Sequence, residues 1–442
     1  MKKHWFRAAI LLLAVLLTGC ILDPAESLFA VPQQPEAYYD LQKAIETAMP
    51  TGASYSPPVA GENQQAVQMV DLDGNGDDEA VVYLKTTGSN PLSIYIFNEI
   101  GGEYCLVASL DVNGSAFDQV LYAKVDDTPG YEIVLGRSIS DQVAKLLCVY
   151  TLREDGLNEL LRASCTEYLT ADLDGDGQQG IFLLRSEADV SYGIAEYYHW
   201  QDHQLLRERE ASTSTAVTAV KRIITGQMCE GVSAVFVAAE YGEGTIVTDI
   251  FGMRNEEFCN LTKQDDANTG VQTVREYYVY SGDIDSDGLI ELPRLYALRT
   301  VEGDERSENR SLIGWYNIQL DGSEVQKCVT FHNYSDGWYL TIPSGWMEDL
   351  AVTRSGMLGN ALGYCFLWPQ NEGDTELFTI AATSSDQAAQ LAQESGWTVL
   401  VQKGEVTYAV HMGPGAAELG LTEESVWNMF HFIQVAWNTG ET

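Results

Sequence analysis

The chain has 442 residues, of which 45% are hydrophobic, so it is long enough to form more than one domain with a buried core. Its 64 Asp and Glu residues outnumber its 25 Lys and Arg residues, which gives a formal net charge of −39 at pH 7. This charge argues against nucleic-acid binding, because such binding depends on basic contacts to phosphate, and against a surface that lies flat on anionic lipid.

The N-terminal residues 1–19 are expected to form a secretory signal peptide. Lys2, Lys3 and Arg7 precede an apolar run at 8–17. A run of about ten apolar residues is too short to cross a bilayer, which needs roughly 20. The motif LTGC at 17–20 resembles a bacterial lipobox, which implies cleavage before Cys20 and a diacylglycerol on its thiol. We therefore expect an exported lipoprotein anchored to the outer face of a bacterial cell membrane.

Residues 20–62 are expected to hold a lipidated tether and a short amphipathic helix. The segment 35–49 places Leu41, Ile45 and Ala48 on one helical face, with proline in the first turn and after the end. Such an apolar stripe usually packs against a neighbouring domain. We expect this helix to cap the domain that follows.

Three acidic loops share one pattern: DLDGNGDDE at 71–79, DLDGDGQQG at 172–180 and DIDSDGLIE at 283–291. Oxygen-bearing side chains at positions 1, 3 and 5, and a carboxylate at position 9 in two loops, suit Ca²⁺. An EF-hand would need glutamate at position 12, where this chain has Val82, Leu183 and Arg294. Asp and Gly also favour ordinary turns, but three loops whose carboxylates would repel one another without a cation favour calcium.

Apolar, β-branched runs flank these loops, as at 66–70, 79–85, 180–184 and 277–280, so each loop is predicted to be the turn of a β-hairpin. Related strands begin at 132 and 233 without a full motif. The starts 79, 132, 180, 233 and 291 define a period with room for four strands per unit. The first unit predicts strands at 92–98 and 104–110 as well. Residues 63–330 are therefore predicted to form a mainly β fold, a β-propeller of about five four-stranded blades.

The acidic loop leading into a Val/Ile-rich strand resembles the FG-GAP or VCBS repeat of integrin-type propellers and bacterial surface proteins. This resemblance implies ligands at positions 1, 3, 5 and 9 and a backbone carbonyl at position 7. Site one would use Asp71, Asp73, Asn75, the carbonyl of Asp77, and Glu79; site two Asp172, Asp174, Asp176 and the carbonyl of Gln178; site three Asp283, Asp285, Asp287, the carbonyl of Leu289, and Glu291. Gly180 replaces the last carboxylate in site two, so weaker binding is expected there. The second and fourth units are expected to form metal-free turns.

Residues 331–442 lack the acidic loop and are predicted to form a small α+β domain. Strands are expected within 336–346 and at 376–382, 397–402 and 406–412, and helices at 385–395 and 423–437. The segment GWYLTIPSGW at 337–346 and the last helix resemble PsbP/Mog-like domains of exported proteins. No site residue is carried over from that resemblance.

Enzyme motifs are not evident in the sequence. It has no GxSxG, HExxH or Walker loop, and GDGQQG at 175–180 lies within the second acidic loop and leads into a strand rather than a helix. His199 and His203 fall at a strand end and turn, where their spacing does not indicate a metal site.

The seven cysteines after Cys20 are irregularly spaced, which is more typical of buried free thiols than of a disulfide framework.

The leading functional hypothesis is a non-catalytic surface binding or adhesion module for a carbohydrate, a cell-wall component or a protein. Tyrosines such as Tyr192 and Tyr197 could stack on such a ligand, although aromatic residues also fill half-buried strands. Two other classes stay open. One is an envelope hydrolase with its active site in the propeller channel, and the other is a scaffold lipoprotein in a larger complex.

Overall fold

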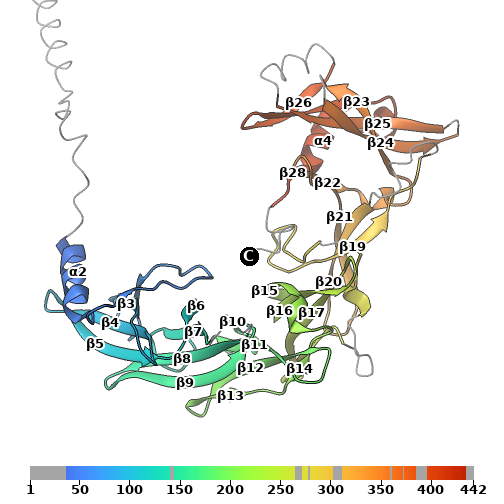
Figure 1. The fold of residues 1–442 in the computed structure, drawn as a ribbon. Helices are drawn as coiled ribbons and strands as arrows, with labels where there is room; N and C mark the ends of the chain where they lie inside the picture. The colour runs from blue at the N-terminus through green and yellow to red at the C-terminus, as the bar shows by residue number, and fades with distance from the viewer. Residues whose placement is uncertain are drawn as a thin grey trace, which may run out of the picture.

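The computed structural model describes residues 36–139, 144–263, 271–276, 279–301, 311–358, 361–371, 373–384 and 396–434. The predicted signal peptide, Cys20 and the predicted helix 385–395 lie outside these ranges. Within them the chain is mainly β, as predicted, and its antiparallel sheets follow one another along an open arc (Figure 1). No helix in these ranges is long and apolar enough to cross a membrane.

The predicted amphipathic helix is present as α2 (Glu36–Ala48). Its Leu41 and Ile45 are buried and pack with Ala80, Val82 and Phe97 of the first sheet. The helix caps the outside of this sheet, at the blue end of the arc in Figure 1. The sequence prediction of a packing helix is confirmed.

The first sheet contains the four predicted strands in a meander, with one short additional strand. They are β1 (Ser54–Tyr55), β2 (Val67–Val70), β3 (Glu79–Lys85), β4 (Leu92–Ile100) and β5 (Glu103–Val112), and both β1 and β2 pair with β3. Every residue of β3 except Lys85 is buried. A strand buried on both faces has an almost continuous apolar sequence, which explains the run AVVYL.

The next three sheets repeat this four-stranded meander. The second has β6 (Ala116–Ala123), β7 (Glu132–Ser138), β8 (Lys145–Arg153) and β9 (Gly156–Cys165). The third has β10 (Glu167–Ala171), β11 (Gly180–Ser186), β12 (Gly193–Gln201) and β13 (Gln204–Arg207), with β14 (Ala211–Ser212) beside β12. The fourth has β15 (Val220–Cys229), β16 (Val232–Gly242), β17 (Thr245–Arg254) and β18 (Glu257–Asn260).

The hydrophobic cores lie between successive sheets. In β7, Ile133 and Leu135 pack with the first sheet, whereas Val134 between them packs with the third. In β11, Leu183 packs with the second sheet and Phe182 with the fourth. Because neighbouring residues of a strand point to opposite faces, each central strand contributes to two cores. This face-to-face succession is propeller-like and agrees with the predicted period.

The fifth sheet extends beyond the expected division between residues 330 and 331. It contains β19 (Leu292–Ala297), β20 (Ser311–Ile318), β21 (Glu324–Asn333), β22 (Trp338–Ile342) and β28 (Phe430–Phe432). The division at 330 falls inside β21, because the sequence after the last acidic loop still has to supply the outer strands of that unit.

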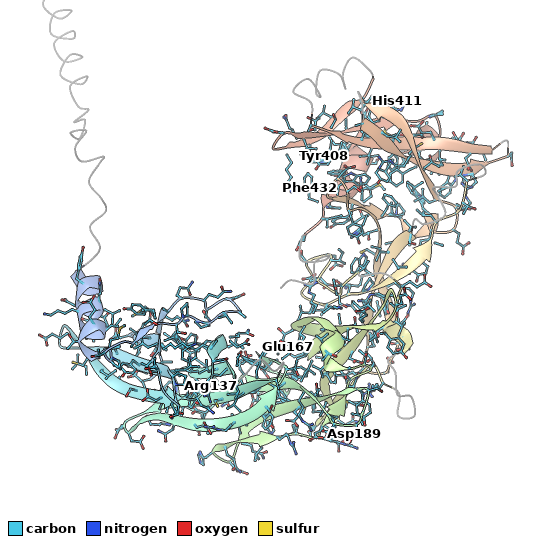
Figure 2. The ribbon with its side chains drawn as sticks, viewed as in Figure 1. Arg137, Glu167, Asp189, Tyr408, His411 and Phe432 are labelled. Atoms are coloured by element: carbon cyan, nitrogen blue, oxygen red, sulfur yellow. The ribbon has the colours of Figure 1, made fainter. Side chains whose placement is uncertain are left out.

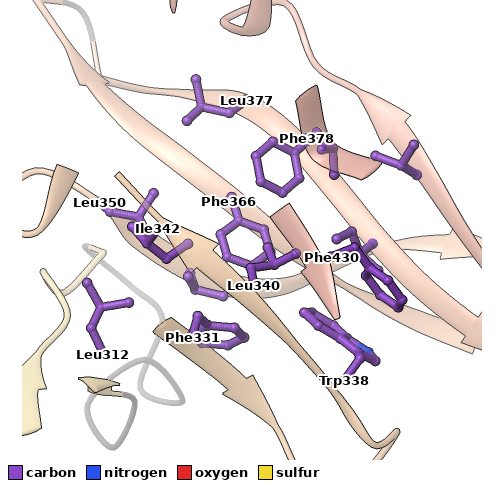
Figure 3. Close-up of a cluster of buried hydrophobic side chains, with 14 of the residues drawn as sticks. Leu312, Phe331, Trp338, Leu340, Ile342, Leu350, Phe366, Leu377, Phe378 and Phe430 are labelled. Carbon is purple, nitrogen blue, oxygen red and sulfur yellow. The ribbon is translucent and has the colours of Figure 1, made fainter. Parts of the chain in front are cut away.

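The last sheet contains β23 (Ala351–Leu358), β24 (Ala361–Gln370), β25 (Gly373–Thr383), β27 (Val406–Met412) and β26 (Thr398–Lys403), in that spatial order. It shares one core with the fifth sheet, where Phe331 and Trp338 pack with Phe366 and Phe378 (Figure 3). Short 3₁₀ turns occur at Val217–Ala219, Val271–Thr273, Ser344–Trp346 and Ala416–Leu419.

The predicted C-terminal helix 423–437 is wrong in length. The helix α4 covers only Glu423–Met429, and the next three residues form β28, which pairs with β22. Its start is defined by a capping box between Thr422 and Ser425. Phe430 then stacks on Trp338 with ring centroids 5.8 Å apart, so pairing to the sheet ends the helix where its apolar spacing would have allowed more turns.

Candidate metal sites in the acidic loops

The acidic loops connect antiparallel chain segments, as predicted. The first loop joins β2 to β3, and the second joins β10 to β11 through a pair between Ala171 and Gly180. The third is closed by an isolated bridge between Gly282 and Glu291 ahead of β19. The strand expected at 277–280 is therefore not formed at 279–280, and residues 277–278 lie outside the described ranges.

The aspartate at position 1 accepts backbone hydrogen bonds in each loop, and the bond from the N–H at position 6 is common to all three. In the first loop, the N–H of Gly74 donates to Oδ1 of Asp71 at 2.7 Å, and the N–H of Gly76 donates to its Oδ2 at 3.1 Å. Asp172 and Asp283 also accept from the N–H at position 6, at 3.0 Å in both loops. Position 6 is glycine with φ between 88° and 94° in all three loops, a conformation that costs other residues strain.

Each loop gathers three carboxylates whose ligand atoms lie within 4.8 Å of one another. The groups are Asp71, Asp73 and Glu79; Asp172, Asp174 and Asp176; and Asp283, Asp285 and Glu291. Like charges at this separation repel, and a cation between them would remove the repulsion. Nine predicted ligand side chains are therefore brought together, and each group could bind a metal ion. The carbonyls of Asp77, Gln178 and Leu289 stay predictions.

Glu79 has an incomplete set of hydrogen bonds. Its side chain is 0% exposed, and its Oε2 accepts from the N–H of Leu72 at 2.8 Å. Its Oε1 is buried and has no hydrogen-bond donor in the described part of the chain. Burial raises the pKa of this carboxyl above its ordinary value, and the charge of Asp73 raises it further. A metal ion would supply the missing partner of Oε1, so the residues present fit a bound cation.

The third loop differs in detail from the first. The N–H of Ile284 donates to Oε2 of Glu291 at 3.0 Å, and the amide of Asn317 donates to Oε1 at 2.9 Å. Burial raises the pKa of Glu291 to about 6.

At position 5 of the third loop, Asp287 is not part of the carboxylate group. Lys327 forms an ion pair with Asp287 and lowers its pKa. Asn75, at the same position of the first loop, donates to Oδ2 of Asp73 at 3.0 Å instead.

In the second loop a tyrosine takes over the structural role of the missing glutamate. The N–H of Leu173 donates to Oη of Tyr197 at 3.2 Å, and this hydroxyl donates to the carbonyl of Ala171 at 3.1 Å. Nδ1 of His199 lies 3.0 Å from Oδ2 of Asp174. The second carboxylate group thus keeps three aspartates and has the imidazole of His199 as a neighbour.

The second unit keeps part of the acidic-loop pattern, with the side chain of Arg153 as the cation. Counting back from Glu132 places Lys124 at position 1 and Asp126 at position 3. Oε2 of Glu132 accepts from the N–H of Val125 at 2.7 Å, the same bond that Glu79 and Glu291 make. Nη2 of Arg153 lies 2.6 Å from Oδ2 of Asp126. A guanidinium therefore pairs with the carboxylate that corresponds to Asp73.

Several of these residues were missed by sequence reasoning. Glu132 could have been found, because it stands at the first residue of a strand whose period was recognised. Tyr197, Arg153 and Lys327 come from later strands of the sheet, so loop spacing carries no signal for them. His199 was placed correctly near a strand end, in β12, but its contact with Asp174 follows only from the sheet pairing.

The described residues thus form a mainly β, propeller-like protein of repeated antiparallel sheets, with acidic loops that could bind metal ions. No protein-family model and no curated protein matches the chain. Among solved structures, it is similar to the exotype rhamnogalacturonan lyase YesX, with 10% identity, a TM-score of 0.30, and coverage of 76% of this chain and 68% of that chain.

Two further solved structures are similar to this chain to about the same degree. The rhamnogalacturonan lyase PL11 of Bacillus licheniformis has 10% identity and a TM-score of 0.30, with 73% of this chain and 71% of that chain covered. The Dos1 propeller has 9% identity and a TM-score of 0.28, with 80% and 81% covered. TM-scores this low carry no argument about function, and the description of the fold rests on the sheets of this chain.

Proposed function

We propose that this chain is a lipid-anchored extracytoplasmic binding protein whose repeated sheets are stabilised by Ca²⁺ in the acidic loops. The observation that carries the calcium proposal is Glu79, whose buried Oε1 lacks a hydrogen-bond donor within a group of three carboxylates. A buried carboxylate oxygen without a partner is costly, so the loop as described is incomplete without a cation.

The donor set favours calcium over other metals. The first and third groups offer carboxylate oxygens, with no imidazole or thiolate among the grouped residues. Such ligands suit a hard cation, and Ca²⁺ accepts six to eight oxygens in flexible geometry whereas Mg²⁺ demands a nearly ideal octahedron. The resemblance of the loops to FG-GAP and VCBS repeats points the same way. When bound, the ion would hold a hairpin turn together, which is a structural role.

The proposed binding role is supported by the predicted export and lipidation signal and by the net charge of the chain. The resemblance of LTGC at 17–20 to a lipobox supports display of the protein outside the membrane, with Cys20 as the lipidated residue. The net charge of −39 disfavours nucleic acid. The ligand we propose is a carbohydrate, a cell-wall component or a protein. Repeated sheets presenting loops at their ends are a common scaffold for such binding.

Two experiments test the proposal. Calorimetric titration of chelator-treated protein with CaCl₂ is expected to show saturable binding that MgCl₂ does not reproduce. Fractionation of cells is expected to find the protein in membranes and the Cys20→Ala variant in the soluble fraction. Absence of calcium binding would refute the metal proposal, whereas membrane retention of the Cys20→Ala variant would refute the lipid anchor.

A further inference from the structure

A cavity of about 320 Å³ lies where the first and second sheets meet. Its lining comes from β5, β7, β8 and β9 and from the chain near Asn90 and Asn113. None of the acidic-loop carboxylates lines it. Sites for small ligands range from roughly 300 to 1,000 Å³, so this cavity has room for one small molecule.

Arg137 of β7 contributes to the lining, and Figure 2 labels it within these sheets. The residue is only 1% exposed. Its Nη1 donates to the carbonyl and to Oδ1 of Asn113, and its Nη2 donates to Sγ of Cys148 at 3.3 Å. Its Nε–H has no acceptor in the described part of the chain. The hydrogen bonds of this guanidinium go to a carbonyl, an amide and a sulfur.

A second arginine in the lining is already matched by a carboxylate. Nε and Nη2 of Arg162 donate to the two oxygens of Glu159 at 2.9 and 2.6 Å. The hydrogen bonds from Arg162 are the main cause that lowers the pKa of Glu159, and the charge of Arg137 adds a smaller effect. Arg137, in contrast, carries a permanent charge, and a buried guanidinium is stabilised most by a carboxylate in bidentate contact. The lining also holds Asp111 and Glu159, but no carboxylate in the described part of the chain hydrogen-bonds to Arg137, so an acidic ligand would supply the partner that its Nε–H lacks.

The rest of the lining is suited to hydroxyl groups and one apolar face. Asn90, Asp111 and Asn113 offer donors and acceptors, while Leu157 and the ring of Tyr150 offer apolar surface. A sugar ring presents hydroxyls at its edge and C–H groups on its face, so it matches both kinds of lining. A neutral sugar would leave the charge of Arg137 without a carboxylate, and a simple acid would leave the amides unused.

We propose that this cavity binds a sugar acid, with the carboxylate of the ligand directed toward Arg137 and its hydroxyls toward Asn90, Asp111 and Asn113. The proposal rests on the binding role proposed above and names the ligand class of one site. It does not depend on which metal fills the acidic loops, because the two kinds of site share no residue.

Calorimetric and NMR titration of the calcium-loaded protein with D-galacturonate tests the proposal, and D-galactose is the matched neutral probe. Galacturonate is expected to bind at least about tenfold more tightly, because one charge-assisted hydrogen bond contributes on the order of 1.4 kcal/mol, a tenfold difference in Kd. Inorganic phosphate is expected to bind more weakly than galacturonate. Equal binding of galactose, equal binding of phosphate or no binding of galacturonate would each overturn the proposal.

Two variants locate the binding. Arg137→Lys keeps the positive charge but removes the planar set of N–H donors of the guanidinium. Asn90→Ala changes an exposed residue at the cavity. Each is expected to weaken galacturonate binding severalfold while the rise in melting temperature that calcium produces stays the same, and unchanged affinity in both would refute the placement. Calcium titration without sugar reports separately on the metal sites, so a protein that binds calcium but not galacturonate contradicts this inference alone.

Discussion

The hydroxyl of Tyr197 occupies the space that any side chain at Gly180 would need. A Cβ atom added to Gly180 would lie 2.3 Å from Oη of Tyr197, so the two residues exclude a glutamate at the ninth position of the second loop. The tyrosine also accepts the N–H of Leu173, which corresponds to the N–H that Glu79 and Glu291 accept in their own loops. The second loop thus keeps the shape of the hairpin turn with a neutral group in place of a carboxylate.

The variant Tyr197→Phe is expected to destabilise the protein. It removes an acceptor from the buried N–H of Leu173 and a donor from the carbonyl of Ala171, and a buried polar group left without a partner costs about 1–3 kcal/mol. Urea denaturation measures the change in the free energy of unfolding. The exposed Tyr192→Phe is the matched control and is expected to leave it unchanged. A loss equal in both variants would contradict the role of the Tyr197 hydroxyl.

Removal of calcium is expected to lower the melting temperature. A ligand bound only to the folded state stabilises it by about 2.7 kcal/mol when its concentration is 100 times its Kd. Asp73→Ala and Asp285→Ala should each reproduce part of the loss and reduce the effect of chelator. The exposed Glu405→Ala lies outside the loops and is the control. A melting temperature that chelator does not change would refute structural calcium.

The three loops are expected to differ in calcium affinity. The second lacks the ninth carboxylate, and its Asp174 already contacts His199 at 3.0 Å, so it should be the weakest site. Calcium titration should therefore show a weak step that Asp174→Asn removes while the tighter steps persist. Loss of a tight step in this variant would contradict the ranking.

Replacing Arg153 with methionine is expected to destabilise the second unit. The side chain of Asp126 is 0% exposed, and Arg153, itself 35% exposed, is its ion-pair partner. Leaving a buried carboxylate unpaired costs about 3–5 kcal/mol when both partners are buried, and solvent at the half-exposed arginine reduces this to about 1–3 kcal/mol. Urea denaturation measures it, with Arg209→Met as the control at an exposed ion pair. An unchanged free energy of unfolding would show that Arg153 does not replace a metal ion.

The features of this fold that depend on residues close together in the sequence could be predicted from the sequence. Strand β3 begins and ends where the apolar run 79–85 predicts. The loop carboxylates converge as their spacing predicts, at positions 1, 3 and 9 in the first and third loops and at positions 1, 3 and 5 in the second. Contacts between strands far apart in sequence were not predictable. Tyr197 reaches the second loop from 24 residues away, and Arg153 reaches Asp126 from 27 residues away.

The C-terminal error has the same cause. The apolar spacing at 423–437 is compatible with a long helix. After Met429, however, the chain leaves the helix, and Phe430 pairs with β22 instead. The spacing of apolar residues within 423–437 indicates only the periodicity of that segment. It carries no information about the edge of β22, which lies nearly a hundred residues earlier in the chain and is available for pairing. Tertiary pairing of this kind overrides local propensity.

Glu132 is expected to make stability depend on pH. Burial is the main cause that raises its pKa above 4.5, the charge of Asp126 adds to the effect, and the N–H of Val125 opposes it. The folded protein therefore holds this proton more tightly than the unfolded chain does. The resulting stability is fully present below pH 4.5 and is lost as the pH rises through the folded-state pKa.

The variant Glu132→Gln isolates this contribution, because glutamine keeps an oxygen that can accept the N–H of Val125 but cannot ionise. Groups that titrate equally in both proteins cancel in the difference between their free energies of unfolding. Measured by urea denaturation in chelator from about pH 4 to about pH 7, this difference is expected to move in favour of the glutamine variant as the pH rises. A difference that is independent of pH, or that moves toward the parent protein, would show that Glu132 is not held in a site that disfavours its charge.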